Sequence, residues 1–307
     1  MSAGMVQPAA DLSFDRPVPR GEVHKRAVQE VLITDSAPLD AASFALAAQL
    51  PRAHRLYGPD PTGRYDALAL GEVVRQATFV VGHRYLDVPA DRQFVLGGFG
   101  LRVEGEPLAD AAAPLDVTVH VEPSELRYLG GELSRYELTG TVLLGGRAVA
   151  EGSGSCLCLT PRSYEVLRRA GTGDVDGRGG PAEALEARAE PGAVVRGDLR
   201  DVVVTPLRDR SDERATAGVV VDPSHPSFFD HPLDHVPGML LLEACRQTAL
   251  QLTGGGLVTA FTAEFVRVAE LGFAVECGAE RRPDGGFDLR VEQAGQPVME
   301  ATMEVRP

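Results

Sequence analysis

Two short segments of the chain carry an acid and a guanidinium three positions apart. Glu72 precedes Arg75, and Glu243 precedes Arg246, in surroundings that are otherwise apolar. Residues at i and i+3 of a helix lie on the same side, so each carboxylate reaches its arginine. In a pocket, such a carboxylate serves as a general base and such an arginine holds an anion. The alternative is a buried ion pair that fixes how the helices pack and that gene duplication has repeated.

A loop ahead of the second pair gathers further groups that bind protons or cations: His225, Asp230, His231, Asp234 and His235. The loop ends at Pro237-Gly238, where an apolar helical stretch begins. The first N–H groups of a helix have no partner within the helix and lie at its positive end. The N–H of Gly238 is therefore expected to polarise a carbonyl group of a bound substrate.

The histidines of this loop have three interpretations. They contact substrate or transfer protons, or they only pack the loop through hydrogen bonds to the backbone. A metal site at His231 and His235 is the third, but Pro232 and Pro237 interrupt the helix that would bring both imidazoles together, so no metal is predicted.

An internal repeat organises the chain. Residues 31–79 align with residues 202–250 at a constant offset of 171 without a gap, and the alignment places His54 on His225. The stretch between the repeats is rich in Gly, Ala and charge, which is typical of a mobile linker. The sequence therefore predicts an N-terminal tail (1–22), a first domain (23–165), a linker (166–195) and a second domain (196–307).

Each repeat is predicted to contain one buried helix, over 65–83 and 238–253, with Gly254 ending the second. Strands are predicted at 117–121, 133–144, 148–159, 273–277, 287–292 and 298–305, with a hairpin turn at 283–286. A helix followed by a strand meander, occurring twice, predicts an α+β fold in which each antiparallel sheet wraps around a central helix.

The composition excludes several classes of function. The 307 residues carry a formal charge of -14, which disfavours nucleic acid and anionic membranes as partners. Four scattered cysteines do not form a disulfide framework, and this fits a cytoplasmic protein. Because the sequence has neither a signal-peptide pattern nor a run of about 18 apolar residues, export and membrane insertion are not expected.

Two segments carry a resemblance to known enzymes. The residues Phe228-Phe229-Asp230-His231-Pro232, followed by Pro237-Gly238 and four apolar residues before Glu243, resemble the active-site segment of the hotdog β-hydroxyacyl-ACP dehydratases. In that family a loop histidine and a helix glutamate do the acid–base work, which implies catalytic roles for His231 and Glu243. The interval between these two residues is two positions shorter here.

The chain as a whole more closely resembles the A-factor biosynthesis family, the γ-butyrolactone synthases that make bacterial hormone precursors. The segments that carry this resemblance are 23–25, 34–36, 50–54, 72–76, 93–94 and 231–247. The resemblance implies a tandem (double) hotdog fold and no cofactor. It also implies transfer of a β-ketoacyl group from acyl carrier protein to a hydroxyl of dihydroxyacetone phosphate, giving an ester that later closes to a butenolide.

The resemblance suggests roles for the duplicated residues. Glu243 or Glu72 would deprotonate the hydroxyl, and Arg246 or Arg75 would hold the phosphate, whose two oxygens suit a planar guanidinium. The paired loop residues His225 and His54 are further candidates for binding substrate.

The two possible sites are expected to be unequal. In paired hotdogs the histidine and the glutamate of one site come from different domains, so His231 pairs with Glu72. The other site has Asp60 with Glu243 and is predicted to be degenerate or to have a different task. Dehydration or hydrolysis of acyl thioesters, and acyl binding without catalysis, are the alternative functions. Two fused domains already pair internally, which favours a monomer.

Overall fold

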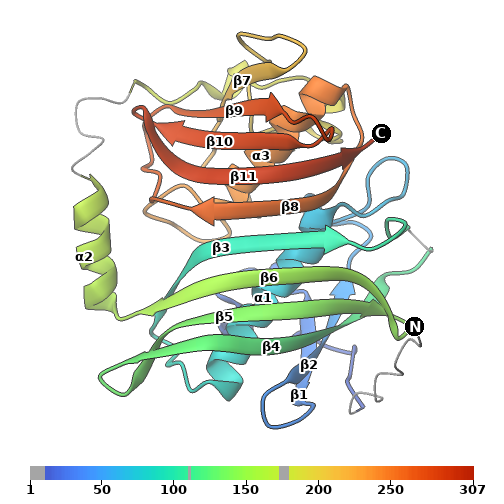
Figure 1. Cartoon of the computed structure of the whole chain (residues 1–307), viewed down its shortest axis with the longest axis vertical. Coiled ribbons are helices and arrows are strands. Elements are labelled where there is room, and N and C mark those ends of the chain that lie inside the picture. The colour runs from blue at the N-terminus through green and yellow to red at the C-terminus, as the bar shows by residue number, and fades with distance from the viewer. Residues whose placement is uncertain (1–10, 110–111, 173–179) are drawn as a thin grey trace.

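One antiparallel sheet and two buried helices make up most of the computed structural model, which describes residues 11–109, 112–172 and 180–307. Within these residues the sheet has eleven strands in the order β1-β2-β4-β5-β6-β3-β8-β11-β10-β9-β7. Figure 1 shows the strands in front and the helices α1 (Ala67–Tyr85) and α3 (Gly238–Thr253) behind them. The sheet therefore runs through both repeats without a break.

The repeats contribute equivalent sets of strands. The first half (11–159) contains β1 (Ile33–Pro38), β2 (Phe44–Leu50), β3 (Gln93–Val103), β4 (Leu115–Leu129), β5 (Glu132–Leu144) and β6 (Arg147–Leu159). The second half (180–307) contains β7 (Arg214–Gly218), β8 (Leu257–Phe265), β9 (Val275–Arg281), β10 (Phe287–Gln293) and β11 (Gln296–Arg306). The order β2-β4-β5-β6-β3 matches β7-β9-β10-β11-β8, so the predicted α+β architecture, a sheet wrapped around each helix, is confirmed.

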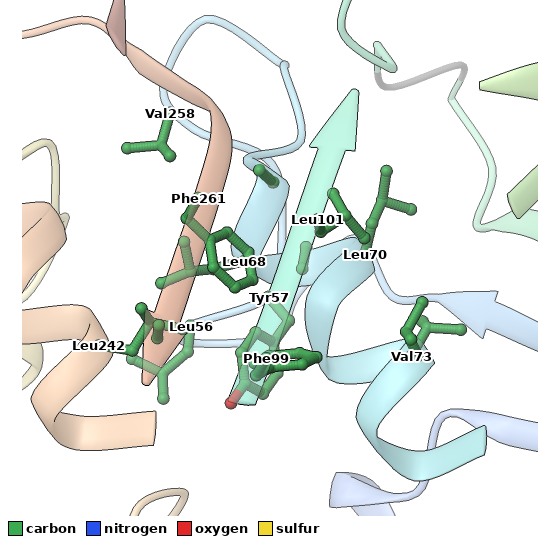
Figure 2. Close-up of a cluster of buried hydrophobic side chains, with 14 of the residues drawn as sticks. Leu56, Tyr57, Leu68, Leu70, Val73, Phe99, Leu101, Leu242, Val258 and Phe261 are labelled. Carbon is green, nitrogen blue, oxygen red and sulfur yellow. The ribbon is translucent and has the colours of Figure 1, made fainter. Parts of the chain in front are cut away.

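The halves join where β3 pairs with β8, from Gly98 opposite Glu264 to Arg102 opposite Ala260. Behind this junction the rings of Phe99 and Phe261 meet edge to face at 5.2 Å between centroids. Figure 2 shows these two rings among side chains from both helices and both strands. Burying such a shared apolar core is the main driving force for folding, so the two halves stabilise each other.

The burial and the ends of the two central helices follow from their sequences. Nearly all of α1 and α3 is buried, which suits their apolar sequences. Asp66 caps α1 by accepting a hydrogen bond from the N–H of Leu68, whereas Pro237 precedes α3 without a side-chain cap. Gly254 ends α3 in the left-handed conformation, as predicted.

Both ends of the predicted linker (166–195) are structured, so less of this segment is unpacked than the sequence suggested. The helix α2 (Pro161–Thr172) occupies its beginning, and residues 173–179 lie outside the described residues. From Pro181 the chain is packed again, with Pro181 bridged to Phe273 and the N–H of Ala189 bonded to Val204. Its buried residues Ala189 and Val194 provide the contacts that the composition did not indicate.

Candidate active site

A pocket of about 400 Å³ lies between the polar side of α1 and the start of α3. Its polar lining comprises His24, Lys25, Tyr57, Arg75, Gln93, Tyr164, Ser227, Asp230, His231, His235 and Arg267. Its apolar lining includes Phe79, Phe94, Leu96, Leu157, Leu233, Met239, Leu241 and Phe265. A larger, more open hollow lies on the outer face of the second half's strands, but it contains none of the predicted site residues.

Helix α1 places Arg75 at one side of this pocket, with the buried Glu72 bonded to it. Arg75 donates from Nε to Oε2 of Glu72 at 2.7 Å and from Nη2 to Oε1 at 2.6 Å, a two-point pair that leaves Nη1 free of the carboxylate. Nζ of Lys25 lies 3.6 Å from Oε1 of the same glutamate. The carboxylate is fully buried, while Arg75 and Lys25 reach the pocket.

The charge of Glu72 is strongly favoured. Burial alone would raise the pKa of this carboxyl, but Arg75, Lys25 and the hydrogen bond from Gln76 outweigh it and lower the pKa from 4.5 to about 2. A carboxylate with so low a pKa is a weak base at neutral pH. Glu72 is therefore suited to fixing Arg75 rather than to removing a proton from an alcohol.

The loop before α3 presents His231 to the pocket with a carboxylate behind it. Nδ1 of His231 lies 2.6 Å from Oδ1 of Asp230, and Oδ2 of Asp230 accepts hydrogen bonds from the N–H groups of Arg26 and Ala27. Asp230 is ionised, because these contacts and Lys25 outweigh its burial and lower its pKa. An anchored carboxylate bonded to Nδ1 sets the imidazole with Nε2 as the proton acceptor.

The first turn of α3 also borders the pocket. Among the described residues, the N–H groups of Gly238 and Met239 have no hydrogen-bond partner. A Cβ on Gly238 would lie 2.7 Å from the ring of Phe265, so the glycine also permits close packing. Two free N–H groups at the positive end of a helix favour an oxygen that carries negative charge.

The repeat-equivalent residues of the second half form a closed cluster. Arg196 donates from Nε to Oε1 of Glu243 at 2.9 Å and lies 2.7 Å from Oε2 through Nη2, and Nη1 of Arg246 is 3.2 Å from Oε1. Nε of Arg246 donates to Oδ2 of Asp66 at 2.8 Å. We call Asp66, Arg196, Glu243 and Arg246 the Glu243 cluster.

The Glu243 cluster is sealed, since Glu243 and Arg246 are 2% and 1% exposed and neither lines the pocket. Burial would lower the pKa of Arg246, but Asp66 and Glu243 raise it above its usual range. The structure therefore does not bring these two predicted site residues to a cavity.

The equivalent residues around the pocket are Lys25, Glu72 and Arg75, with Pro237 in the position of Asp66. We call this group, together with Asp230, His231 and Gly238, the Glu72 site. At equivalent positions the Glu72 site has two cations and one anion, whereas the Glu243 cluster has two of each. Arg246 therefore contacts two carboxylates, Asp66 and Glu243, whereas Arg75 contacts only Glu72 among the described residues and lines the pocket.

The structure brings His231 to the pocket beside Arg75 and Gly238, but not His54 or His225. His225 is buried with Nε2 3.2 Å from Oδ1 of Asp201, and His54 has Nε2 3.3 Å from Oε2 of Glu30 at the equivalent position. In both repeats Nδ1 of the histidine accepts two backbone N–H bonds of its loop. Each histidine thus holds its own loop. Neither lines the pocket, so the structure does not place them where the sequence predicted contact with substrate.

Asp60 occupies the position of His231 in the first repeat. Its Oδ1 accepts hydrogen bonds from Thr62 and Arg64 of the same turn, and it does not line the pocket.

No group of three or more metal-ligating side chains occurs in the described parts of the chain. Within those parts, no helix is long and apolar enough to cross a membrane.

Several residues of the site were not identified from the sequence. Lys25 and Arg196 are equivalent, and the offset of 171 extends back to Val18 and Ala189, whose N–H groups bond Ile33 and Val204. An alignment extended upstream by a few residues would have found this pair. The sequence identified Asp230 only as one of several acidic residues in the loop. Its contact with His231, which gives it a role in the site, is visible only in the structure.

Comparison with known proteins places these observations in a family. The model of the A-factor biosynthesis hotdog domain matches residues 6–160 and again residues 181–307. A 2-oxo-3-(phosphooxy)propyl 3-oxoalkanoate synthase of Streptomyces virginiae is 37% identical over 83% of this chain and 84% of its own length. A synthase of the same name from Streptomyces coelicolor is 32% identical over 78% of this chain and 73% of its own.

Solved structures share the fold. The 12:0-ACP thioesterase from Umbellularia californica has a TM-score of 0.55 at 15% identity and covers 88% of this chain and 100% of its own. An acyl-ACP thioesterase from Bacteroides thetaiotaomicron has a TM-score of 0.54 at 13% identity, covering 85% of this chain and 98% of its own. At this level of identity the similarity establishes the double hotdog fold alone.

Proposed function

The chain belongs to the A-factor biosynthesis hotdog family, and from this premise we propose that its Glu72 site transfers a 3-oxoacyl group from an acyl thioester to a hydroxyl of dihydroxyacetone phosphate. The enzyme is an acyltransferase of the kind that its relatives' name describes. The acyl donor in this proposal is a thioester of acyl carrier protein. The active unit in this proposal is a single chain, which the pairing of the two halves through β3 and β8 supports.

The observation that carries the proposal is that Arg75 lacks the second carboxylate that Arg246 contacts at the equivalent place. In the Glu243 cluster, the carboxylate of Asp66 joins the first turn of α1 to Arg246. At the equivalent place Pro237 supplies no carboxylate, and Arg75 and the first turn of α3 both line an open pocket. A phosphate group in the pocket would give Arg75 the second anionic partner that Asp66 gives Arg246.

The phosphate binds against Arg75 and Lys25. Glu72 holds two nitrogens of Arg75, so the guanidinium is oriented before substrate arrives and offers Nη1 to the phosphate. The guanidinium also lies over the ring of Phe79, with Cζ 4.9 Å from the ring centroid. Lys25 adds a second positive charge at the pocket wall.

The acyl chain occupies the apolar part of the pocket, between Phe94 and Leu96 of β3 on one side and Met239 and Leu241 of α3 on the other. This arrangement brings the thioester carbonyl to the start of α3. The free N–H groups of Gly238 and Met239 then stabilise the negative charge that develops on the carbonyl oxygen.

His231 is the general base in this proposal, rather than Glu72 or Glu243. Its Nε2 takes the proton of the substrate hydroxyl while the oxygen attacks the thioester carbon. The new C–O bond forms, the C–S bond breaks, and the thiol leaves the pocket. Asp230 stays ionised and stabilises the imidazolium of His231 during this step.

The test is an assay of the purified chain with a 3-oxoacyl thioester on phosphopantetheinylated carrier protein, followed by mass spectrometry. With dihydroxyacetone phosphate the expected product is the phosphorylated 3-oxoacyl ester. Unphosphorylated dihydroxyacetone is the matched control, and it should react at least tenfold more slowly because Arg75 and Lys25 lose their partner. Release of free acid as the only product would support hydrolysis and contradict the proposal. Loss of water from a 3-hydroxyacyl thioester would support dehydration instead.

A further inference from the structure

A second pair of imidazoles lies at the pocket, apart from His231. Nε2 of His24 is 2.9 Å from Nε2 of His83, and Nδ1 of His83 is 2.9 Å from the carbonyl oxygen of Val88. His24 lines the pocket, and His83 stands in the last turn of α1. The rings of Phe79 and Phe94 pack edge-on against His24 at 5.0 and 4.9 Å, which fixes its plane.

The carbonyl of Val88 determines where the hydrogens of this pair lie. A carbonyl oxygen only accepts, so Nδ1 of His83 carries a hydrogen in every state. When His83 is neutral, its Nε2 accepts from Nε2–H of His24. When His83 is protonated, its Nε2 donates to His24, whose hydrogen then sits on Nδ1. The pair thus moves a proton between His83 and Nδ1 of His24.

The two imidazoles have different surroundings. The negative end of the helix dipole lies at the C-terminal turn of α1, where His83 is located. Burial, and the charges of His83 and Arg75 on α1 and His231 in the loop before α3, lower the pKa of His24 to about 4. His24 therefore stays neutral at working pH, and a proton that leaves its Nδ1 is replaced at its Nε2 through the contact with His83.

Neither imidazole has a counterpart in the second half. Val195 stands at the position of His24, with the same left-handed backbone, and Gly254 stands at the position of His83. Among the described residues, Nδ1 of His24 has no hydrogen-bond partner. The pair therefore accompanies the half that has the pocket and is absent where the Glu243 cluster is sealed.

We propose that His24 is the general acid that protonates the departing thiolate, with His83 as the positioning residue that supplies its proton. This inference rests on the proposed acyl transfer. As the C–S bond breaks, the sulfur takes the hydrogen on Nδ1 of His24, and Nε2 of His24 takes the hydrogen of His83. His231 meanwhile holds the proton of the hydroxyl and releases it to solvent, which reprotonates His83.

A proton donor matters here because an alkyl thiol has a pKa of about 8.5 in water. In a largely apolar pocket that pKa rises, since burial disfavours the thiolate. An aryl thiol is much more acidic and leaves as a stable anion without help. The dependence of the rate on the leaving group therefore separates an acid catalyst from a structural residue.

The experiment compares wild type and His24→Asn with an alkyl (N-acetylcysteamine) and an aryl (thiophenyl) 3-oxoacyl thioester. Asparagine suits the backbone at residue 24, where φ is 54°. We expect kcat to fall about 100-fold with the alkyl donor and less than about threefold with the aryl donor. His83→Gln should show the same preference more weakly, together with a shifted pH profile for the alkyl donor.

His231→Gln is the matched comparison, because loss of the base for the alcohol slows both donors equally. Equal losses with both donors in His24→Asn, or no loss with either, would overturn the inference. Exchange of the acyl group between two alkyl thiols is measured in parallel and requires no triose phosphate. If exchange depends on His24 but no phosphorylated ester forms, only the proposed acceptor is wrong. If wild type catalyses neither reaction, both proposals fail.

Discussion

The Glu72 site and the Glu243 cluster share an acid, a guanidinium and a second cation at equivalent positions, yet one opens on a pocket and the other is sealed. One of the differences lies at the start of a helix. Asp66 gives Arg246 a second carboxylate, whereas Pro237 at the equivalent position gives Arg75 none. The comparison indicates that a duplicated ion pair becomes structural when the protein supplies the arginine's second anionic partner, and is available for substrate when it does not.

The largest expected effect is on catalysis at the Glu72 site. His231→Gln removes the proton acceptor and should lower kcat by about 10² to 10⁴-fold. The thermal midpoint should hardly change, because the side chain of His231 is 32% exposed. His235→Gln is the control, since His235 lines the same pocket and also pairs with an adjacent aspartate at 2.6 Å. A larger loss of kcat in the control would reassign the base.

The second effect is on stability, at the Glu243 cluster. Asp66→Asn leaves the guanidinium of Arg246 buried with less compensation and should lower the free energy of unfolding by about 3 to 5 kcal/mol. Denaturant unfolding measures this change. The folded fraction should keep its kcat, because the Glu243 cluster takes no part in transfer. A normal stability with a lost kcat would show that the sealed half is catalytic after all.

The third effect concerns acid. The folded-state pKa of Glu72 is depressed from 4.5 to about 2, so its stabilisation is fully present above about pH 4.5 and is lost as the pH falls toward 2. The shift corresponds to roughly 3 kcal/mol. Unfolding curves of wild type and Glu72→Gln at pH 6 and pH 3 should therefore differ less at pH 3. An equal difference at both values would mean that the pairs with Arg75 and Lys25 do not hold the charge.

The smallest effect separates the two arginines. Arg75→Lys keeps the charge but loses the planar fork, and should raise KM for dihydroxyacetone phosphate about tenfold. Arg246→Lys is the matched substitution in the sealed half and should leave KM unchanged while lowering the thermal midpoint. Steady-state kinetics with the triose phosphate as the varied substrate compares the two. Similar KM values for the two variants would show that Arg75 and Arg246 do not differ in their contribution to phosphate binding.

Much of the fold was predictable because its signals are local. The bounds of α3 agree with the prediction at both ends, since Pro237-Gly238 and Gly254 mark them, and the predicted strands fall within or close to β4, β5, β6, β9, β10 and β11. The two strands that join the halves, β3 and β8, were missed. Glycines 97, 98 and 100 weaken the strand pattern of β3, although Gly98 and Gly100 allow close contact with Glu264 and Phe261 of β8.

The site was predictable only in part, because its asymmetry depends on contacts between the halves. The sequence predicted that Glu72 and His231 belong to one site. It did not indicate that Asp66 reaches Arg246, since the two residues are 180 positions apart and only the fold brings them together. The pKa of Glu72 likewise depends on Lys25, which approaches from outside the helix.

We expect each chain to have one site for a phosphorylated substrate, although the acid and guanidinium pair occurs twice. Calorimetric titration of the chain with dihydroxyacetone phosphate measures this number directly. One equivalent should bind per chain, and binding should be lost in Arg75→Ala and retained in Arg246→Lys. Two equivalents per chain, or binding that survives Arg75→Ala, would contradict this expectation.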